Sequence, residues 1–223
     1  MPANRNDPLK VTINLMENHI SSAGRFPFKL AKIIAVMYLL LVYPLAMIIP
    51  YELAWENGPI ENLQVVILLT ACLVNFRLYR KSDSTEKMYL WQAVFLALLV
   101  GRELSWGRVF FQVGINEYGP SFIKLPPDQK MILNVVLGLV MVWLVVNMVR
   151  WVPWKKLAQS IHRLPWCFIG LMFACVAFMT VGEKGMFGID LHVGGTIEEL
   201  AELDLYFCLC CLSAWYSENF CKQ

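Results

Sequence analysis

Charged residues are scarce in this chain of 223 residues. Lys, Arg, Asp and Glu make up 16% of it, whereas a soluble domain carries roughly 25%. The apolar share is 58%, and the net charge is only +2, with the basic residues scattered among apolar runs. This pattern lacks the basic face of a nucleic-acid-binding protein. We therefore expect an all-α membrane protein with no nucleic-acid partner.

Histidine is also rare, and several catalytic motifs are absent. The three histidines are His19, His162 and His192, and only His192 falls in a predicted outer loop, so a three-histidine zinc site is excluded. No H-E-x-x-H or G-x-S-x-G motif occurs, and Ser105 has no histidine near it in sequence. The seven cysteines lie in apolar runs or in the C-terminal tail, so we interpret them as packing residues rather than disulfide partners.

Six apolar runs are long enough to cross the hydrocarbon core of a membrane, which takes about 20 residues. They start near Leu30, Ile60, Met88, Met131, Leu164 and Ile197. The pattern predicts one polytopic bundle of six transmembrane helices over residues 30–217. A cytoplasmic segment, 1–29, would precede it and a cytoplasmic tail, 218–223, would follow. Apolar residues at helical spacing within 9–20 predict a short amphipathic helix on the inner membrane surface.

Lysine and arginine gather in alternate connections, which sets the expected orientation. The N-terminal segment and the connections at 77–87 and 150–163 each hold four of them. In contrast, the connection at 51–59 holds none and the one at 182–196 holds only Lys184. We expect both termini in the cytoplasm. The chain also has no N-x-S/T glycosylation site, which is compatible with a bacterial inner membrane.

The unusual polar residues fall at the outer ends of three predicted spans. They are Glu61, Asn62 and Gln64 in the second span, Arg102, Glu103, Trp106 and Arg108 in the third, and Glu198, Glu199 and Glu202 in the last. An isolated charge costs about 2.5 to 3.5 kcal/mol at the centre of a span, and less near its boundary. We therefore expect these side chains to point at one another around a wet pocket that opens to the outer leaflet.

The residue types in this expected pocket suggest roles. Carboxylates at low dielectric can act as general acid and base, and the candidates are Glu61, Glu103, Glu198 and Glu202. Groups that would hold a substrate are Arg102, Arg108, Trp106, Gln64, Asn62 and Lys184. A divalent metal is a further hypothesis, with Glu199 and His192 as additional ligands. The alternative is a structural salt-bridge network that fixes helix register.

Three classes of function stay open. An enzyme that modifies a membrane lipid or lipid-linked substrate is slightly favoured, because acids and cations meet at headgroup depth. A carrier could use the same acids to bind a cation or proton, although the inner half of the bundle offers no complete polar path. A subunit or immunity protein would bind another membrane protein through the outer loop at 112–130.

The third span carries a recognisable segment. Arg102-Glu103-Leu104-Ser105-Trp106-Gly107 resembles the Glu-Glu-x-Ser-Trp-Gly segment of uncharacterised small multi-pass bacterial membrane proteins, with arginine in place of the first acid. The acidic start of the last helix fits the same proteins. The resemblance covers two short segments and implies a shared pocket, without naming a reaction. Arg102 argues against a two-carboxylate mechanism on this span alone.

Overall fold

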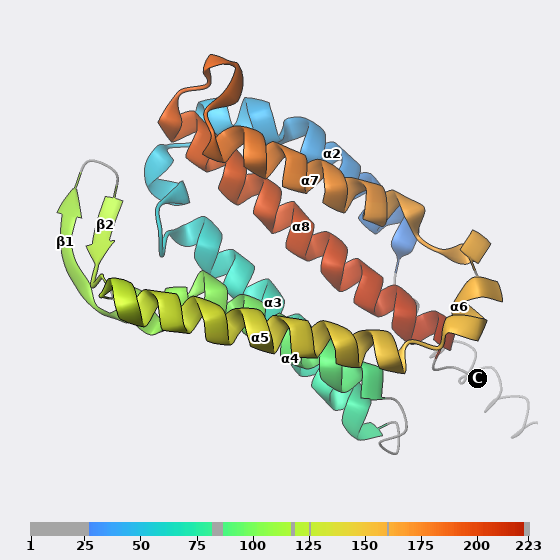
Figure 1. Cartoon of the computed structure of the whole chain (residues 1–223). Coiled ribbons are helices and arrows are strands. Elements are labelled where there is room, and N and C mark those ends of the chain that lie inside the picture. The colour runs from blue at the N-terminus through green and yellow to red at the C-terminus, as the bar shows by residue number, and fades with distance from the viewer. Residues whose placement is uncertain (1–26, 82–86, 117–118, 125, 160, 221–223) are drawn as a thin grey trace, which may run out of the picture.

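The computed structural model describes residues 27–81, 87–116, 119–124, 126–159 and 161–220. The predicted amphipathic helix at 9–20 lies outside these residues. Six long helices run back and forth along one bundle in the described part (Figure 1). They are α2 (Phe28–Ile48), α3 (Pro59–Lys81), α4 (Lys87–Glu103), α5 (Pro127–Trp151), α7 (Trp166–Glu183) and α8 (Leu191–Phe220). The prediction of a mostly helical protein is confirmed.

Shorter elements connect these helices. Four of them are helical turns, namely η1 (Tyr51–Ala54), η2 (Ser105–Phe110), η3 (Ile161–Arg163) and η4 (Met186–Gly188), and a fifth is the short helix α6 (Trp154–Gln159). An antiparallel hairpin of β1 (Gln112–Asn116) and β2 (Gly119–Phe122) lies between η2 and α5. We call the end of the bundle that holds η1, the hairpin and η4 the hairpin end, and the opposite end the terminal end (Figure 1). The described chain both begins and ends at the terminal end.

Four segments of the described chain are long and apolar enough to cross a membrane. They are Phe28–Ile48, Tyr51–Arg80, Pro127–Trp151 and Trp166–Glu183. Such segments are typical of a membrane protein. Two further helices of the bundle differ from them: α4 has only 17 residues, and the 30-residue α8 carries four acids between Glu198 and Asp204.

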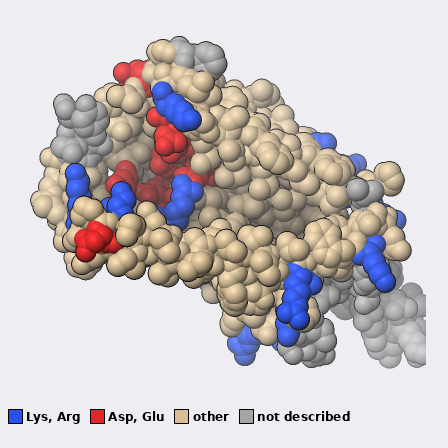
Figure 2. Space-filling model, viewed as in Figure 1, with Lys and Arg blue, Asp and Glu red and all other residues tan. Residues whose placement is uncertain are grey.

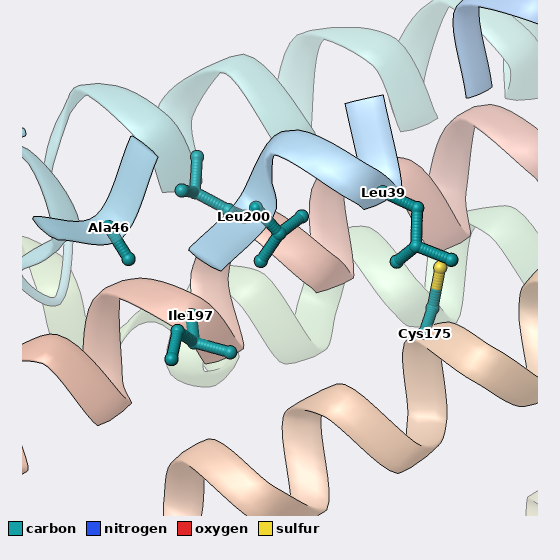
Figure 3. Packing of buried hydrophobic residues seen from close by; sticks show 6 residues of the cluster. Leu39, Ala46, Cys175, Ile197 and Leu200 are labelled. Carbon is teal, nitrogen blue, oxygen red and sulfur yellow. The ribbon is translucent and has the colours of Figure 1, made fainter. Parts of the chain in front are cut away.

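Helix α8 is the centre of the bundle, because it packs against α2, α3 and α7. Figure 3 shows part of the apolar core that α2, α7 and α8 share, with Leu39, Ala46, Cys175, Ile197 and Leu200 labelled. Near the hairpin end, α7 and α8 approach each other at two glycines. A Cβ atom at Gly182 would lie 2.5 Å from the carbonyl oxygen of Gly194, so only glycine permits this backbone contact.

Helix α5 lies at the edge of the bundle and packs mainly against α4. Leu144 is its one buried residue among those described, while twelve large apolar side chains along it are exposed. The ring of Trp143 meets the ring of Trp91 on α4 edge to face, with centroids 5.0 Å apart. This exposed apolar surface agrees with a helix long and apolar enough to cross a membrane.

The structure corrects the sequence prediction at three places. The third predicted span includes Trp106 and Arg108, and its apolar run continues to Phe110 and Phe111, but helix α4 already ends at Glu103. The helix stops there because Ser105, Trp106 and Gly107 adopt left-handed backbone conformations. The predicted loop at 112–130 contains the hairpin and the first turn of α5, so the fold is not purely α-helical. Helix α8 starts before Ile197 and reaches Phe220, beyond the predicted start of the tail at 218.

A buried polar cluster lies in the terminal half of the bundle, where the sequence suggested few polar groups. The Ser213 hydroxyl on α8 lies 2.9 Å from Oδ1 of Asn75 on α3 and 3.0 Å from Oε1 of Gln92 on α4. Asn75 uses its amide N–H to donate to the carbonyl of Ala71, which fixes its oxygen as an acceptor. The Ser213 hydroxyl carries one proton, so it can donate to only one of these two amide oxygens at a time.

Candidate functional site

Four glutamates from three helices meet near the hairpin end, and we call them the carboxylate group. They are Glu61 at the start of α3, Glu103 at the end of α4, and Glu199 and Glu202 in α8. Glu61, Glu103 and Glu202 are 9%, 4% and 2% exposed. Glu61 lies within electrostatic range of Glu103 and Glu202, and Glu199 lies within range of the other three. The expected convergence of acids thus occurs around a buried centre.

Tyr206 joins two of these carboxylates. It lies one turn after Glu202 on α8, and its hydroxyl is 2.6 Å from Oε1 of Glu103 and 2.9 Å from Oε1 of Glu202. A phenol carries one proton, so it can donate to only one of the two carboxylates. The three side chains therefore form one hydrogen-bonded junction between α4 and α8.

Arg102 covers this junction from the last turn of α4. Its guanidinium pairs with Glu202, and its Nη1 donates to the Tyr206 hydroxyl at 3.3 Å. Its Nε lies 3.7 Å from Oε1 of Glu103. The Arg102 side chain is 50% exposed, whereas the carboxylates beneath it are almost fully buried. Among the described residues, Arg102 is the only cation paired with the carboxylate group.

Gln64 is completely buried beside the fourth carboxylate. Its Nε2 donates to the backbone carbonyl of Glu199 at 2.9 Å and to Oε2 of the same residue at 3.0 Å. No donor among the described residues reaches the Gln64 Oε1 atom. A buried amide oxygen normally accepts a hydrogen bond. The carboxylate group and Gln64 therefore offer more acceptors than their protein neighbours satisfy.

The space-filling view shows that the bundle is hollowed at this end. Acidic side chains gather in the depth of the hollow, and lysine and arginine side chains lie along its edge (Figure 2). At the terminal end, by contrast, the charged side chains visible on this face are mainly basic. On this face, acidic side chains therefore gather at the hairpin end, whereas basic side chains lie at both ends.

A second compartment, which we call the cationic pocket, lies beside this hollow between η2 and the first turns of α5. It has a volume of about 590 Å³. Its lining consists of Ser105, Trp106, Arg108, Lys124, Pro127, Lys130, Leu133 and Asn134. Three cations and three further side chains with hydrogen-bonding atoms thus face one cavity. Such a lining suits a phosphate or another anionic group.

A strained turn after α4 places the residues of this pocket. Ser105, Trp106 and Gly107 have φ angles of 42°, 54° and 88°, which only the glycine adopts readily. The turn folds the Trp106 ring back against α4, where a Cβ atom at Gly101 would lie 2.6 Å from it. Left-handed conformations at non-glycine residues are costly and concentrate at functional sites. The turn at 105–107 is therefore a part of the candidate site.

Glu56, in the connection between η1 and α3, ties the turn to the rest of the bundle. Its Oε1 accepts a hydrogen bond of 2.8 Å from the Ser105 hydroxyl and lies 3.7 Å from Nη2 of Arg108. Both contacts are partly exposed, so each contributes modestly to stability. These contacts hold two lining residues of the cationic pocket, Ser105 and Arg108, against the connection between η1 and α3.

The other residues that the sequence predicted for the site lie at the edge of the carboxylate group or outside it. Asn62 donates from its side-chain amide to the backbone carbonyls of Asn57 and Gly58, and so links the first turn of α3 to the connection before it. Glu198 is half-buried, within electrostatic range of Glu202 and Arg102, but its backbone lies against α7. Lys184 is exposed at the C-cap of α7, outside the group.

The two residues predicted as metal ligands lie in different surroundings. Glu199 belongs to the carboxylate group, whereas the ring of His192 packs edge to face against Tyr51, with centroids 4.4 Å apart. Among the described residues, no group of three or more His, Cys, Asp or Glu side chains could hold a metal ion. The structure therefore gives the metal hypothesis no site in this part of the chain.

The sequence interpretation missed Tyr206, Lys124 and Lys130. Tyr206 looked like one more aromatic residue in an apolar span, although its position four residues after Glu202 places both on one helix face. The two lysines are far from Arg108 in sequence, and only the hairpin brings them to it. Comparisons of the chain with protein-family models, with curated proteins and with solved structures gave no match.

Proposed function

We propose that this chain is a six-span integral protein of a bacterial inner membrane with both termini in the cytoplasm. In this arrangement the basic terminal end faces inward, as the positive-inside rule requires, and the hollow opens at the outer leaflet. Helices α4 and α8 complete the six passes. The charges of α8 are sheltered because α2, α3 and α7 surround it.

We further propose that the hollow binds and modifies a lipid or lipid-linked substrate. The observation that carries this proposal is the bridging of Glu103 and Glu202 by the Tyr206 hydroxyl, next to a cationic pocket. Catalysis that uses a general acid and a general base needs two such groups within reach of one substrate. An anionic headgroup would be held by the cationic pocket, at the depth where headgroups lie.

The proposed chemistry is a hydrolysis or transfer at the headgroup. One carboxylate takes the proton of the attacking hydroxyl, and the protonated partner gives a proton to the leaving oxygen. Tyr206 restores the starting state, because it passes its proton to one carboxyl as it receives one from the other. Arg102 stabilises the carboxylate that is ionised at each stage. The resemblance to small bacterial membrane proteins agrees with a shared pocket of this kind.

Lipid profiles test this proposal directly. Extracts from cells that express the wild-type chain should contain a lipid species that cells without it lack. The variants Glu103→Gln and Glu202→Gln should remove that species while the protein still inserts and remains folded. Glu52→Gln is the matched control, because Glu52 is an exposed acid at the same end and outside the carboxylate group. Wild-type behaviour of both Gln variants would assign the group a structural role.

A carrier of a cation or proton is the second candidate. One observation favours it: within the described residues, the four carboxyl groups of the carboxylate group have one paired arginine, so the group has capacity for added positive charge. Against it stands a layer of apolar side chains between the group and the Asn75 cluster. That layer is formed by Val65, Leu68, Leu96 and Val100, on the described parts of α3 and α4.

The Ser213→Ala variant separates the two candidates. A carrier would use the polar cluster in the terminal half, so the change should impair cation or proton uptake into proteoliposomes. An enzyme confined to the hairpin end should keep its lipid product unchanged. Altered cation uptake together with an unchanged lipid profile in the wild type would establish the carrier instead.

A further inference from the structure

The carboxylate group and the cationic pocket lie next to each other, but they favour ligand groups of opposite charge. Glu103 belongs to the first and Ser105 to the second, so a single turn of chain connects them. The first compartment is rich in acceptors and negative charge, and the second is rich in donors and positive charge. A ligand that fills both must carry a cation and an anion a short distance apart.

The carboxylate group and Gln64 contain more hydrogen-bond acceptors than the donors of the described residues satisfy. Among the described residues, Arg102 is the one cation that pairs with the carboxylate group, and it reaches Glu103 and Glu202 only. The Tyr206 hydroxyl contacts the same two carboxyl groups and carries a single proton. The buried Oε1 of Gln64 adds an acceptor that no described donor reaches. A primary ammonium group carries three N–H donors and one positive charge, so it suits this arrangement.

The lining of the cationic pocket favours an anionic ligand group. Arg108, Lys124 and Lys130 line it together with the Ser105 hydroxyl, and Glu56 pairs with only one of these cations. Beside it, Phe110 and Phe111 are 72% and 61% exposed, which gives acyl chains an apolar surface next to the phosphate position. A phosphodiester with attached acyl chains therefore matches this side of the site.

We propose that the substrate headgroup is a zwitterionic phosphoethanolamine, with its phosphate in the cationic pocket and its ammonium in the carboxylate group. This inference rests on the proposed function, because it names the substrate class of the same site. It excludes a purely anionic headgroup, which the carboxylates would repel. It also disfavours phosphocholine, whose quaternary nitrogen has no N–H to donate to Gln64 Oε1.

Competitive lipid binding to the full-length chain tests the assignment. The purified protein in detergent is mixed with equal amounts of phosphatidylethanolamine, phosphatidylglycerol and phosphatidylcholine, and the retained lipid is counted by native mass spectrometry. We expect phosphatidylethanolamine to be retained at least about tenfold over the others, since hydrogen bonds to a charged group are each worth about 1.5–3 kcal/mol. Equal retention, or a preference for phosphatidylglycerol, would overturn the proposal without any need for a variant.

Two variants then test which site holds the ammonium group and which holds the phosphate. Glu199→Gln removes one carboxylate outside the Tyr206 bridge and should reduce the preference for phosphatidylethanolamine to less than about threefold. Lys130→Gln should weaken retention of all three phospholipids alike. Arg150→Gln, which removes a cation at the terminal end, should change neither property. A preference that survives Glu199→Gln contradicts the placement of the ammonium group.

The lipid-binding experiment and the lipid-profile experiment can give independent results, so the headgroup assignment and the proposed catalysis can fail separately. Selective binding of phosphatidylethanolamine with an unchanged cellular lipid profile supports the headgroup assignment and contradicts catalysis. A new lipid product whose precursor lacks an amine supports catalysis and contradicts the headgroup assignment.

Discussion

The Tyr206 hydroxyl lies 2.6 Å from Glu103 of α4 and 2.9 Å from Glu202 on its own helix. The residue is 1% exposed, and its ring packs with the apolar layer formed by Val65, Leu68, Leu96 and Val100. One side chain therefore contributes both to the core of the bundle and to the junction of the carboxylate group. The two contributions can be separated by removing the oxygen alone.

The variant Tyr206→Phe keeps the ring and deletes the hydroxyl. We expect it to reduce the lipid product at least about a hundredfold, within the range that general acid and base catalysis contributes. Stability should fall by only about 1–3 kcal/mol, because two carboxyl groups lose a partner while the packing is retained. Lipid profiling and thermal unfolding in detergent measure the two effects. Full product formation by Tyr206→Phe would rule out the proton relay.

The pairing of Arg102 with Glu202 should appear as a coupling between variants. Arg102→Gln leaves the buried carboxylate without its cation, and we expect a loss of about 1–3 kcal/mol, less than for a fully buried pair because Arg102 is half exposed. Adding Glu202→Gln should recover part of that loss. The free energies of unfolding of the two single variants and the double variant give the coupling energy. Additive losses would show that the pair has no energetic role.

A substitution at Gly101 tests whether the position of the Trp106 ring matters for lipid binding. A methyl group at Gly101 would lie 2.6 Å from the indole ring, so Gly101→Ala should displace the ring and reshape the cationic pocket. We expect phospholipid retention to drop at least about fivefold, with little change in unfolding temperature. Gly138→Ala on α5 is the control, because a methyl group there has nothing within 4 Å. If both variants bound lipid like the wild type, Trp106 would not shape the binding site.

A substitution at Gly182 tests the close backbone contact between α7 and α8. Gly182→Ala would place a methyl group 2.5 Å from the Gly194 carbonyl oxygen and about 3.3 Å from the Glu198 nitrogen, so the helices must separate. We expect a loss of about 1–3 kcal/mol in unfolding free energy. Gly170→Ala on the same helix meets nothing within 4 Å and should be neutral or stabilise by up to about 1 kcal/mol. Equal unfolding temperatures for the two variants would contradict the close backbone contact.

Hydropathy and charge predict the helices well, because burial of apolar surface dominates their placement. The predicted and observed starts agree within a few residues for the runs at Leu30, Ile60 and Met88. The end of α4 could not be predicted in this way. Phe110 and Phe111 extend the apolar run, and hydropathy does not report the backbone angles that break the helix at Ser105.

The meeting of acids from separate helices also follows from a simple energetic argument. Glu61, Glu103 and Glu202 are each too costly to bury alone, and the bundle places them together. The division into two compartments does not follow from the sequence, because Lys130 reaches Arg108 only through the hairpin. Likewise, helical spacing relates Tyr206 to Glu202, but it cannot show that Glu103 comes to the same hydroxyl from α4.

The peripheral position of α5 bears on how the protein must be handled. This helix supplies Pro127, Lys130, Leu133 and Asn134 to the cationic pocket, yet nearly all of its surface faces away from the other helices. Its placement is therefore governed by the surrounding solvent more than by contacts within the chain. Micelles that pack loosely around α5 should loosen one wall of the pocket and leave the acids on α8 undisturbed. Measurements in bilayers and in detergent can then disagree about phosphate affinity while they agree about proton chemistry.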